Sequence, residues 1–133
     1  MLLCDAVQEA NGKLFILGGG WTYIGPEIGP MGVAILMEVP WADANKKHHF
    51  KLTLCNTDMA PVAVGPEGQI MQMEGEIEVG RPPGAPVGNP FMVPLALNVA
   101  PLPLAPDARF LWVLEVDGDT SADWQLGFNT RPR

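Results

Sequence analysis

An acidic segment near residue 120 is the chain's clearest candidate for metal chemistry. The run DGDTSAD places carboxylates at Asp117, Asp119 and Asp123, and hard cations such as calcium bind several oxygen ligands held close together. An EF-hand loop would also need Gly where this chain has Ala122 and Glu where it has Phe128. We therefore interpret the run as a polar hairpin loop. A weak cation site completed by carboxylates from another loop stays open as the alternative.

Two further groups of ionisable residues do not predict a catalytic or metal site. Glu74, Glu76 and Glu78 recur with a period of two, which places them on one face of a strand, and three carboxylates in a row are typical of a solvated face. His48 and His49 are adjacent, so on a strand they point to opposite faces and do not easily bind one metal. No Cys or His cluster completes a zinc site.

The parts needed for nucleophilic catalysis are missing. Ser121, the only serine, lies in the acidic run and outside any nucleophile-elbow motif. Cys55 lies at the end of a predicted strand, and because a reactive thiolate needs a nearby cation or helix N-terminus, we interpret it as a structural thiol. The run Gly18-Gly19-Gly20 lacks the Lys-Ser/Thr of a phosphate loop. We expect no enzymatic activity, no catalytic residues, no metal site and no cofactor.

Charge and hydropathy exclude other classes. The net charge is −7, and the basic residues are scattered, with only Lys46 and Lys47 adjacent, so we expect no nucleic-acid binding and no docking to anionic membrane. No run approaches the ~18 apolar residues of a membrane span. The first residues do not resemble a signal peptide. We expect a cytoplasmic protein in which Cys4 and Cys55 are free, buried thiols.

The elements that must position these residues are strands. Short runs alternate apolar and polar residues, and Gly and Pro separate them, which is typical of an all-β domain. We expect one domain over residues 1–133, an antiparallel two-layer β-sandwich of about eight or nine strands, with at most one short helical turn at 40–45. The expected strands are 2–10, 13–17, 33–39, 49–56, 62–64, 70–79, 91–99, 109–117 and 124–129.

Two of these strands have predictable places. Pro94 interrupts the 91–99 run, and proline cannot donate to a ladder, so this strand is an edge strand or a bulged one. The 109–117 run is the most apolar and is expected to be central. The residues predicted for the core are Phe50, Leu52, Leu54, Phe110, Trp112, Leu114, Trp124, Leu126 and Phe128.

Several strands are apolar in both phases. Leu111 and Val113 lie opposite Phe110 and Trp112, and Ala34/Leu36 lie opposite Ile35/Met37. A strand with one solvated face alternates cleanly, so the second face must also be covered. The cover is either the chain's own loops, at 82–90 and 100–106, or another subunit.

Three segments carry a family resemblance. The stretches LLCDAVQEANGKLFILGGGW, MGVAILMEVPWADANKKHHFKLTL and FMVPLALNVAPLPLAPDARFLWVLEVDG resemble a family of small uncharacterised bacterial proteins, over nearly the whole chain. The resemblance implies a compact β-sandwich in a cytoplasmic bacterial setting, and it implies no activity and no site residues.

The expected function is therefore a non-enzymatic one. We expect protein–protein contacts, as a homo-oligomer or an accessory subunit, and a small-ligand or cation-binding module using the loops at one end is the alternative. The interface is expected from residues 18–24 and 91–104, because aromatics beside Gly/Pro turns are poorly sheltered by their own strand. The candidate interface residues are Trp21, Tyr23, Trp41, Phe91, Pro94 and Leu102.

Overall fold

The computed structural model describes residues 1–133, and nearly all its regular structure is β. The two short 3-10 turns are η1 (Trp41–Asp43) and η2 (Ala122–Trp124). Neither is long enough to cross a membrane. The strands are β1 (Leu2–Cys4), β2 (Ala6–Ala10), β3 (Lys13–Leu17), β4 (Tyr23–Ile24), β5 (Met31–Val39), β6 (Lys47–Cys55), β7 (Ala63–Val64), β8 (Gln69–Ile70), β9 (Gln72–Glu78), β10 (Phe91–Val99), β11 (Arg109–Val116) and β12 (Gln125–Thr130).

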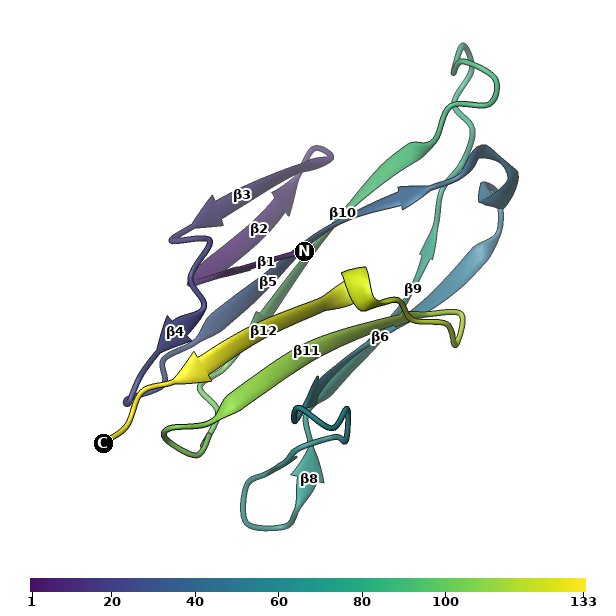
Figure 1. Cartoon of the computed structure of the whole chain (residues 1–133). Coiled ribbons are helices and arrows are strands. Elements are labelled where there is room, and N and C mark those ends of the chain that lie inside the picture. The colour runs from purple at the N-terminus through teal and green to yellow at the C-terminus, as the bar shows by residue number, and fades with distance from the viewer.

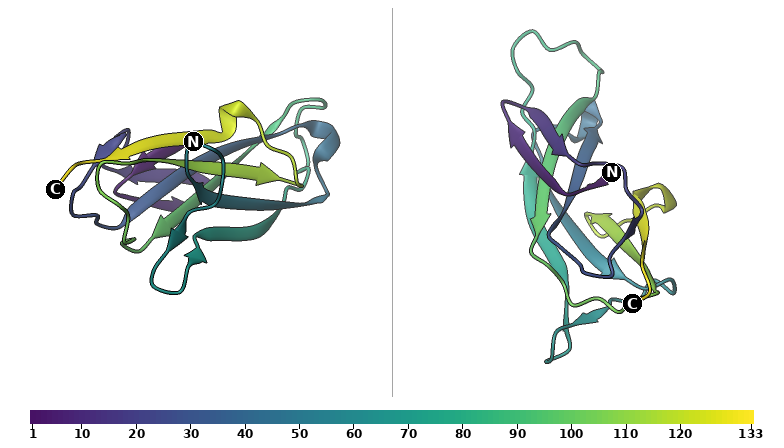
Figure 2. Two further views of the ribbon diagram at one scale, coloured as in Figure 1. Left: turned by 60° about the horizontal axis from the view of Figure 1, so that its bottom comes forward. Right: turned by 90° about the vertical axis from the view of Figure 1, so that its left-hand side faces the viewer.

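Two sheets form the sandwich (Figures 1 and 2). The smaller sheet has the order β1-β5-β10, and the larger one has the order β4-β12-β11-β6-β9. All pairs in these two sheets are antiparallel except β4 with β12. The all-β class is thus confirmed. So are the edge position of β10, the strand with Pro94, and the interior position of β11.

The core lies between the two sheets. One face of β5 supplies Val33 and Ile35, and β11 supplies Trp112, which is fully buried. Seven of the nine residues predicted for the core are buried, and Leu126 is half-buried against them. The buried seven are Phe50, Leu52, Leu54, Phe110, Trp112, Leu114 and Phe128.

The prediction for Trp124 was wrong, and so was the limit of one helical turn. The Ser121 hydroxyl accepts a hydrogen bond from the Asp123 main-chain N–H (3.3 Å), and Trp124 N–H donates to the Ser121 carbonyl (2.9 Å). These bonds form η2, so β12 begins only at Gln125. Trp124 lies on this turn at the rim of the sandwich, with 36% of its surface exposed.

The expected strand 2–10 is divided at Asp5. β1 joins the smaller sheet, whereas β2 pairs only with β3 as a separate hairpin. Asp5 N–H donates to the carbonyls of Leu17 and Gly18, at 3.0 and 3.2 Å, and this contact fixes the break. Other assigned strands, such as β7 and β8, contain only two residues each, so the structure has more, shorter strands than the sequence predicts.

This hairpin covers part of the second apolar face of the smaller sheet (Figure 1). Val7 packs against Cys4 and Ala34, with Leu14 and Ala96 at the margin of the same cluster. The cover of Ala34 is therefore the N-terminal hairpin rather than the loops 82–90 and 100–106. Both free thiols, Cys4 and Cys55, are buried as expected.

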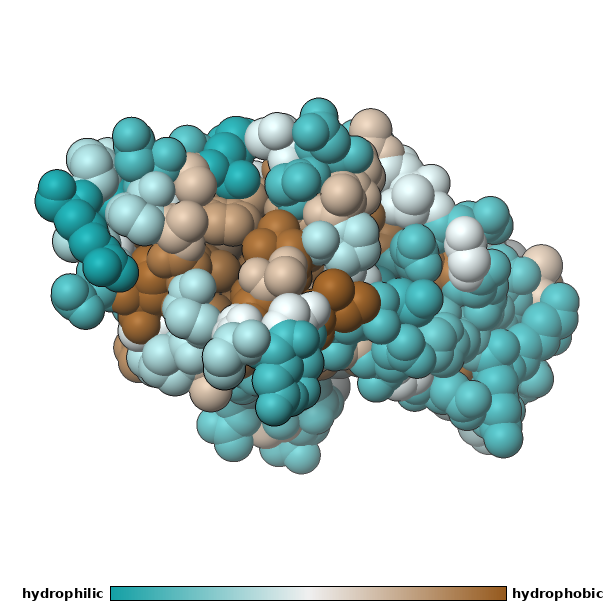
Figure 3. All heavy atoms as spheres, turned by 90° about the horizontal axis from the view of Figure 1, so that it is seen from below, coloured by the Kyte–Doolittle hydropathy of each residue, from teal (hydrophilic) through white to brown (hydrophobic).

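Some large hydrophobic side chains remain at the surface. Viewed from below, the molecule shows hydrophobic residues gathered in the middle of one face, with hydrophilic residues occupying the right-hand part (Figure 3). The most exposed large hydrophobics include Leu36 and Met92 on the outer face of the smaller sheet, and Phe15 and Leu17 on β3.

Candidate functional site

A groove opens along one side of the sandwich, where both sheets have partly paired edges. β1 pairs only with residues 32–34 of β5, so the edge of β5 beyond Ala34 has no strand partner on that side. β4 pairs only with residues 129–130 of β12. Met1 at the N-terminus and Asp123 and Trp124 of the turn before β12 line this opening. The groove exists because neither short strand extends along its neighbour.

The groove has a volume of about 570 Å³. One wall is the continuous segment 35–40, and the opposite side includes Leu114, Val116 and Trp124. Its apolar surface comes from eight hydrophobic residues, and its ionisable side chains are Glu38, Asp43, His48, Asp117 and Asp123. This combination of apolar walls and a few polar groups is typical of binding sites.

His48 is fixed between two acceptors at the groove. Its Nδ1 lies 2.7 Å from Asp117 Oδ2, and its Nε2 lies 2.8 Å from the main-chain oxygen of Asp43. Both ring nitrogens therefore face acceptors, and only the imidazolium form donates from both. The Asp43 carbonyl, followed by the Asp117 carboxylate, raises the pKa of His48 above its ordinary value of 6.5.

Asp117 is in turn fully engaged. Besides the His48 contact, its Oδ1 accepts a hydrogen bond from the His49 main-chain N–H at 2.9 Å. The hydrogen bond from His48 and then the one from His49 lower the pKa of Asp117. The His48–Asp117 contact connects β6 to the turn after β11, and the bond from His48 to the Asp43 main-chain oxygen connects β6 to η1. His48 therefore anchors one end of the groove.

The remaining carboxylates of the groove are free. No ion pair within the chain involves Glu38, Asp43 or Asp123. No three His, Cys, Asp or Glu side chains lie close enough together to hold a metal ion. Of the three acidic residues considered for a cation loop, Asp117 and Asp123 line the groove and Asp119 does not.

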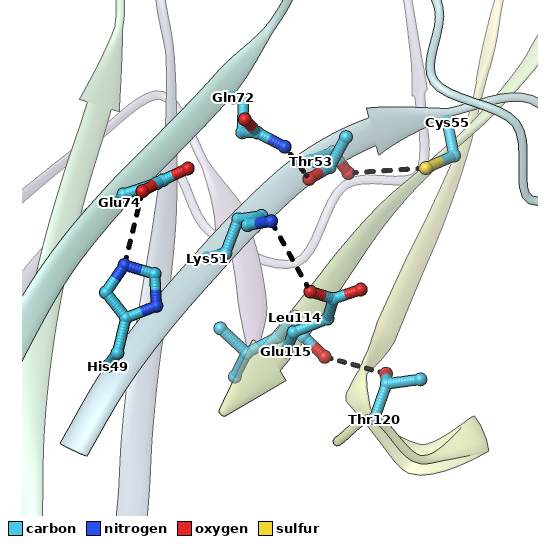
Figure 4. Close-up of polar contacts among 9 residues, drawn as sticks. All are labelled: His49, Lys51, Thr53, Cys55, Gln72, Glu74, Leu114, Glu115 and Thr120. Carbon is cyan, nitrogen blue, oxygen red and sulfur yellow. Dashed lines mark hydrogen bonds and ion pairs between the residues drawn. The ribbon is translucent and has the colours of Figure 1, made fainter. Parts of the chain in front are cut away.

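A second group of ionisable residues lies on the outer face of the larger sheet. Glu74, Glu76 and Glu78 are exposed, as expected for a solvated face. His49 Nε2 lies 3.2 Å from Glu74 Oε2, and Lys51 Nζ lies 3.9 Å from Glu115 Oε2 (Figure 4). His48 and His49 thus point to opposite faces of β6, as their adjacency predicts.

Four of the six residues proposed for an interface lie in two regions. Tyr23 pairs with Asn129, and Trp21 packs edge-to-face on Phe128, with ring centroids 6.0 Å apart. Trp41 stacks on Phe91 at 5.7 Å, near the Val39 end of β5.

Arg81 and Arg131 cover two of these aromatics from within the chain. The Arg81 guanidinium lies 4.3 Å from the Trp41 ring centre, and the Arg131 guanidinium lies 4.9 Å from that of Tyr23. Pro94 pairs with Leu36 in mid-strand, and Leu102 packs against the core. The structure does not gather the six residues into one patch.

Sequence reasoning missed Glu38, Asp43 and Met1 as groove residues. Glu38 alternates with Met37 and Val39 and reads as the solvated phase of a strand. Only the incomplete pairing of β5 places it beside an opening. A detectable signal was the pair formed by Asp43, within the predicted helical turn at 40–45, and His48, five residues later.

The fold and the groove define a small, acidic β-sandwich protein with a partly open sheet edge beside an apolar, acid-rimmed cleft. The chain belongs to a family of unknown function, DUF6941, whose model matches residues 1–129. No curated protein and no solved structure matches the chain.

Proposed function

We propose that this protein is a protein-interaction module that accepts an extended segment of a partner protein along the free edge of β5. The observation that carries the proposal is the position of that edge. Residues 35–39 have no strand partner on the β1 side, and the same residues form a continuous wall of the groove. An extended segment adds to such an edge by main-chain hydrogen bonds, while pockets beside it select side chains.

The charges of the groove favour a basic partner segment. Glu38, Asp43 and Asp123 have no cation within the chain, and the protein as a whole carries −7. These carboxylates are too dispersed to share one metal ion. A polypeptide with lysine or arginine alternating with apolar residues distributes its positive charges over the same length, so it complements both the carboxylates and the apolar walls.

A small organic cation is the second candidate. The groove's volume of about 570 Å³ falls within the range of small-molecule sites. Trp124, exposed over 36% of its surface, lines the groove together with the unpaired Asp123, and an aromatic face beside a carboxylate suits an ammonium group. We favour a peptide because a small cation would leave the free edge of β5 unused.

The proposal includes no catalytic step. Ser121 caps η2. Burial raises the pKa of the Cys4 and Cys55 thiols, and both lie outside the groove. The groove therefore offers binding groups without a nucleophile.

The test uses two labelled synthetic nonapeptides, one alternating lysine with leucine and the other alternating glutamate with leucine. Fluorescence anisotropy should show saturable binding of the lysine peptide only. Trp124→Ala should weaken that binding about tenfold or more, because it removes a groove wall. Asp123→Asn should weaken it, whereas the matched control Asp119→Asn, outside the groove, should not.

NMR locates the binding. Amide shifts at residues 35–39 on titration support strand addition. Lysinamide competes fully if the site holds only a small cation, and such competition without shifts along β5 would support the second candidate. Equal binding of both peptides, or equal effects of Asp123→Asn and Asp119→Asn, would contradict the proposal.

A further inference from the structure

The β2–β3 hairpin presents an unpaired strand at the surface. β3 pairs with β2 alone, so its other edge is free. Its side chains are apolar from Leu14 to Leu17, and Phe15 and Leu17 expose 57% and 69% of their surfaces. Long apolar free edges are templates for pairing with another chain.

The outer edges of the two sandwich sheets are protected, and β3 is not. β9 carries Glu74, Glu76 and Glu78 at the edge of the larger sheet, and β10 carries Pro94 at the edge of the smaller one. Charges and proline are the usual means of preventing edge-to-edge pairing. β3 has no charge and no proline between Leu14 and Leu17. This contrast indicates that pairing at β3 is permitted.

We propose that β3 pairs antiparallel with β3 of a second copy of this chain, about a twofold axis at Phe15. In that register Phe15 faces Phe15 of the second copy, and Leu14 faces Ile16. The two hairpins then form one four-stranded sheet. A twofold interface uses the same surface on both copies, and a short antiparallel strand centred on one residue meets this condition.

Charge complementarity favours a second copy as the occupant. The same register places Lys13 opposite Leu17 of the second copy, next to Gly18. The Asp5 carboxylate lies directly against Gly18, since a β-carbon built there would contact it. Neither Lys13 nor Asp5 has an ion-pair partner within its own chain. Pairing therefore brings each Lys13 within reach of the other copy's Asp5, twice by symmetry.

Light scattering across a dilution series tests the proposal, from about 1 μM to about 1 mM, the range of weak to moderate association. The native chain should convert from monomer to dimer. Leu17→Lys should raise the dissociation constant about 100-fold, because it places a lysine directly opposite Lys13 of the second copy, twice by symmetry. Val87→Lys is the matched control: Val87 is 84% exposed in the 81–90 loop, and its variant should dimerise normally.

Two further variants test the register. Phe15→Cys should form a reducible dimer under mild oxidation, because residues directly opposite each other lie within disulfide range, whereas Val87→Cys should not. Asp5→Lys and Lys13→Glu should each weaken the dimer, and the double variant should restore it. A native chain that stays monomeric throughout, or equal association of Leu17→Lys and Val87→Lys, would overturn the proposal. These outcomes are independent of peptide binding at the groove, which lies along β5.

Discussion

The side-chain amide of Asn98 hydrogen-bonds both main-chain groups of Val7. Asn98 Nδ2 donates to the Val7 carbonyl at 2.7 Å, and Val7 N–H donates to Asn98 Oδ1 at 3.1 Å. Gly32 allows this close approach, since a β-carbon there would lie 2.9 Å from Cys4 Sγ and 3.1 Å from Val7 Cγ1. One amide of β10 thereby fixes the N-terminal hairpin on the outer face of the smaller sheet.

Replacing Asn98 with alanine should loosen this hairpin. Both main-chain groups of Val7 lose their partner, and an unsatisfied buried group costs about 1–3 kcal/mol. We expect a lower free energy of unfolding by urea and faster hydrogen exchange for the β2 and β3 amides, with β11 amides less affected. Asn89→Ala, in the exposed 81–90 loop, is the control. Equal hydrogen exchange in the two variants would contradict the role of Asn98 in holding the hairpin.

The contacts of His48 predict that stability depends on pH in a defined direction. The pKa of His48 is raised in the folded state, so its contribution is complete below its ordinary value of 6.5 and is lost as the pH rises through the higher folded value. The pKa of Asp117 is lowered from 3.8, so its contribution is complete above 3.8 and is lost as the pH falls through the lower folded value. The pair stabilises most between these limits.

The urea midpoint of the native chain should accordingly include a His48 contribution at about pH 5.5 that is absent at about pH 9. His48→Gln should reduce the difference between the two midpoints. His49→Gln is the control, because its side chain contacts Glu74 on the exposed outer face, away from Asp43 and Asp117. If both variants keep the native difference, the His48 contacts do not form in solution.

Truncation of the core should be costly at Trp112 and mild at Trp124. Trp112 is fully buried and Phe110 is 6% exposed, and removing a large buried aromatic costs about 3–5 kcal/mol through lost burial and the remaining cavity. We expect Phe110→Ala and Trp112→Ala to lower the free energy of unfolding by that amount, measured by urea denaturation. Trp124→Ala should cost much less, and a similar loss in both tryptophan variants would mean that the groove rim is structural.

Calcium should not bind tightly to the acidic segment. The Asp117 carboxylate is already engaged by His48 and His49, Asp119 lies outside the groove, and no three ligand side chains converge. Calorimetric titration with calcium should show no saturable binding at micromolar concentrations. A saturable isotherm lost in Asp123→Asn would instead establish a cation site at this loop.

The sequence determined the local features of this protein. Alternation of apolar residues specified the strands and most of the core, because a period of two places Phe50, Leu52 and Leu54 on one face whatever the sheet order. Pro94 limited its strand to an edge or bulged position, because its nitrogen has no hydrogen to donate, and the structure places the strand at the edge. The adjacency of His48 and His49 specified that they point to opposite faces, because neighbouring side chains of a strand alternate between its two faces.

Only the tertiary structure decided where the strands stop pairing. Nothing in residues 2–10 shows that the chain leaves the smaller sheet at Asp5, since that break depends on hydrogen bonds to Leu17 and Gly18. The free edge of β5 beyond Ala34, and with it the groove, lies at the other end of β1, where Leu2 is the last residue to pair with β5. The contacts of His48 with Asp117, 69 residues away, likewise depend on the order of strands in the sheet. Local sequence patterns specify which face of a strand each side chain occupies. Where strand pairing stops depends on which distant segments of the chain meet.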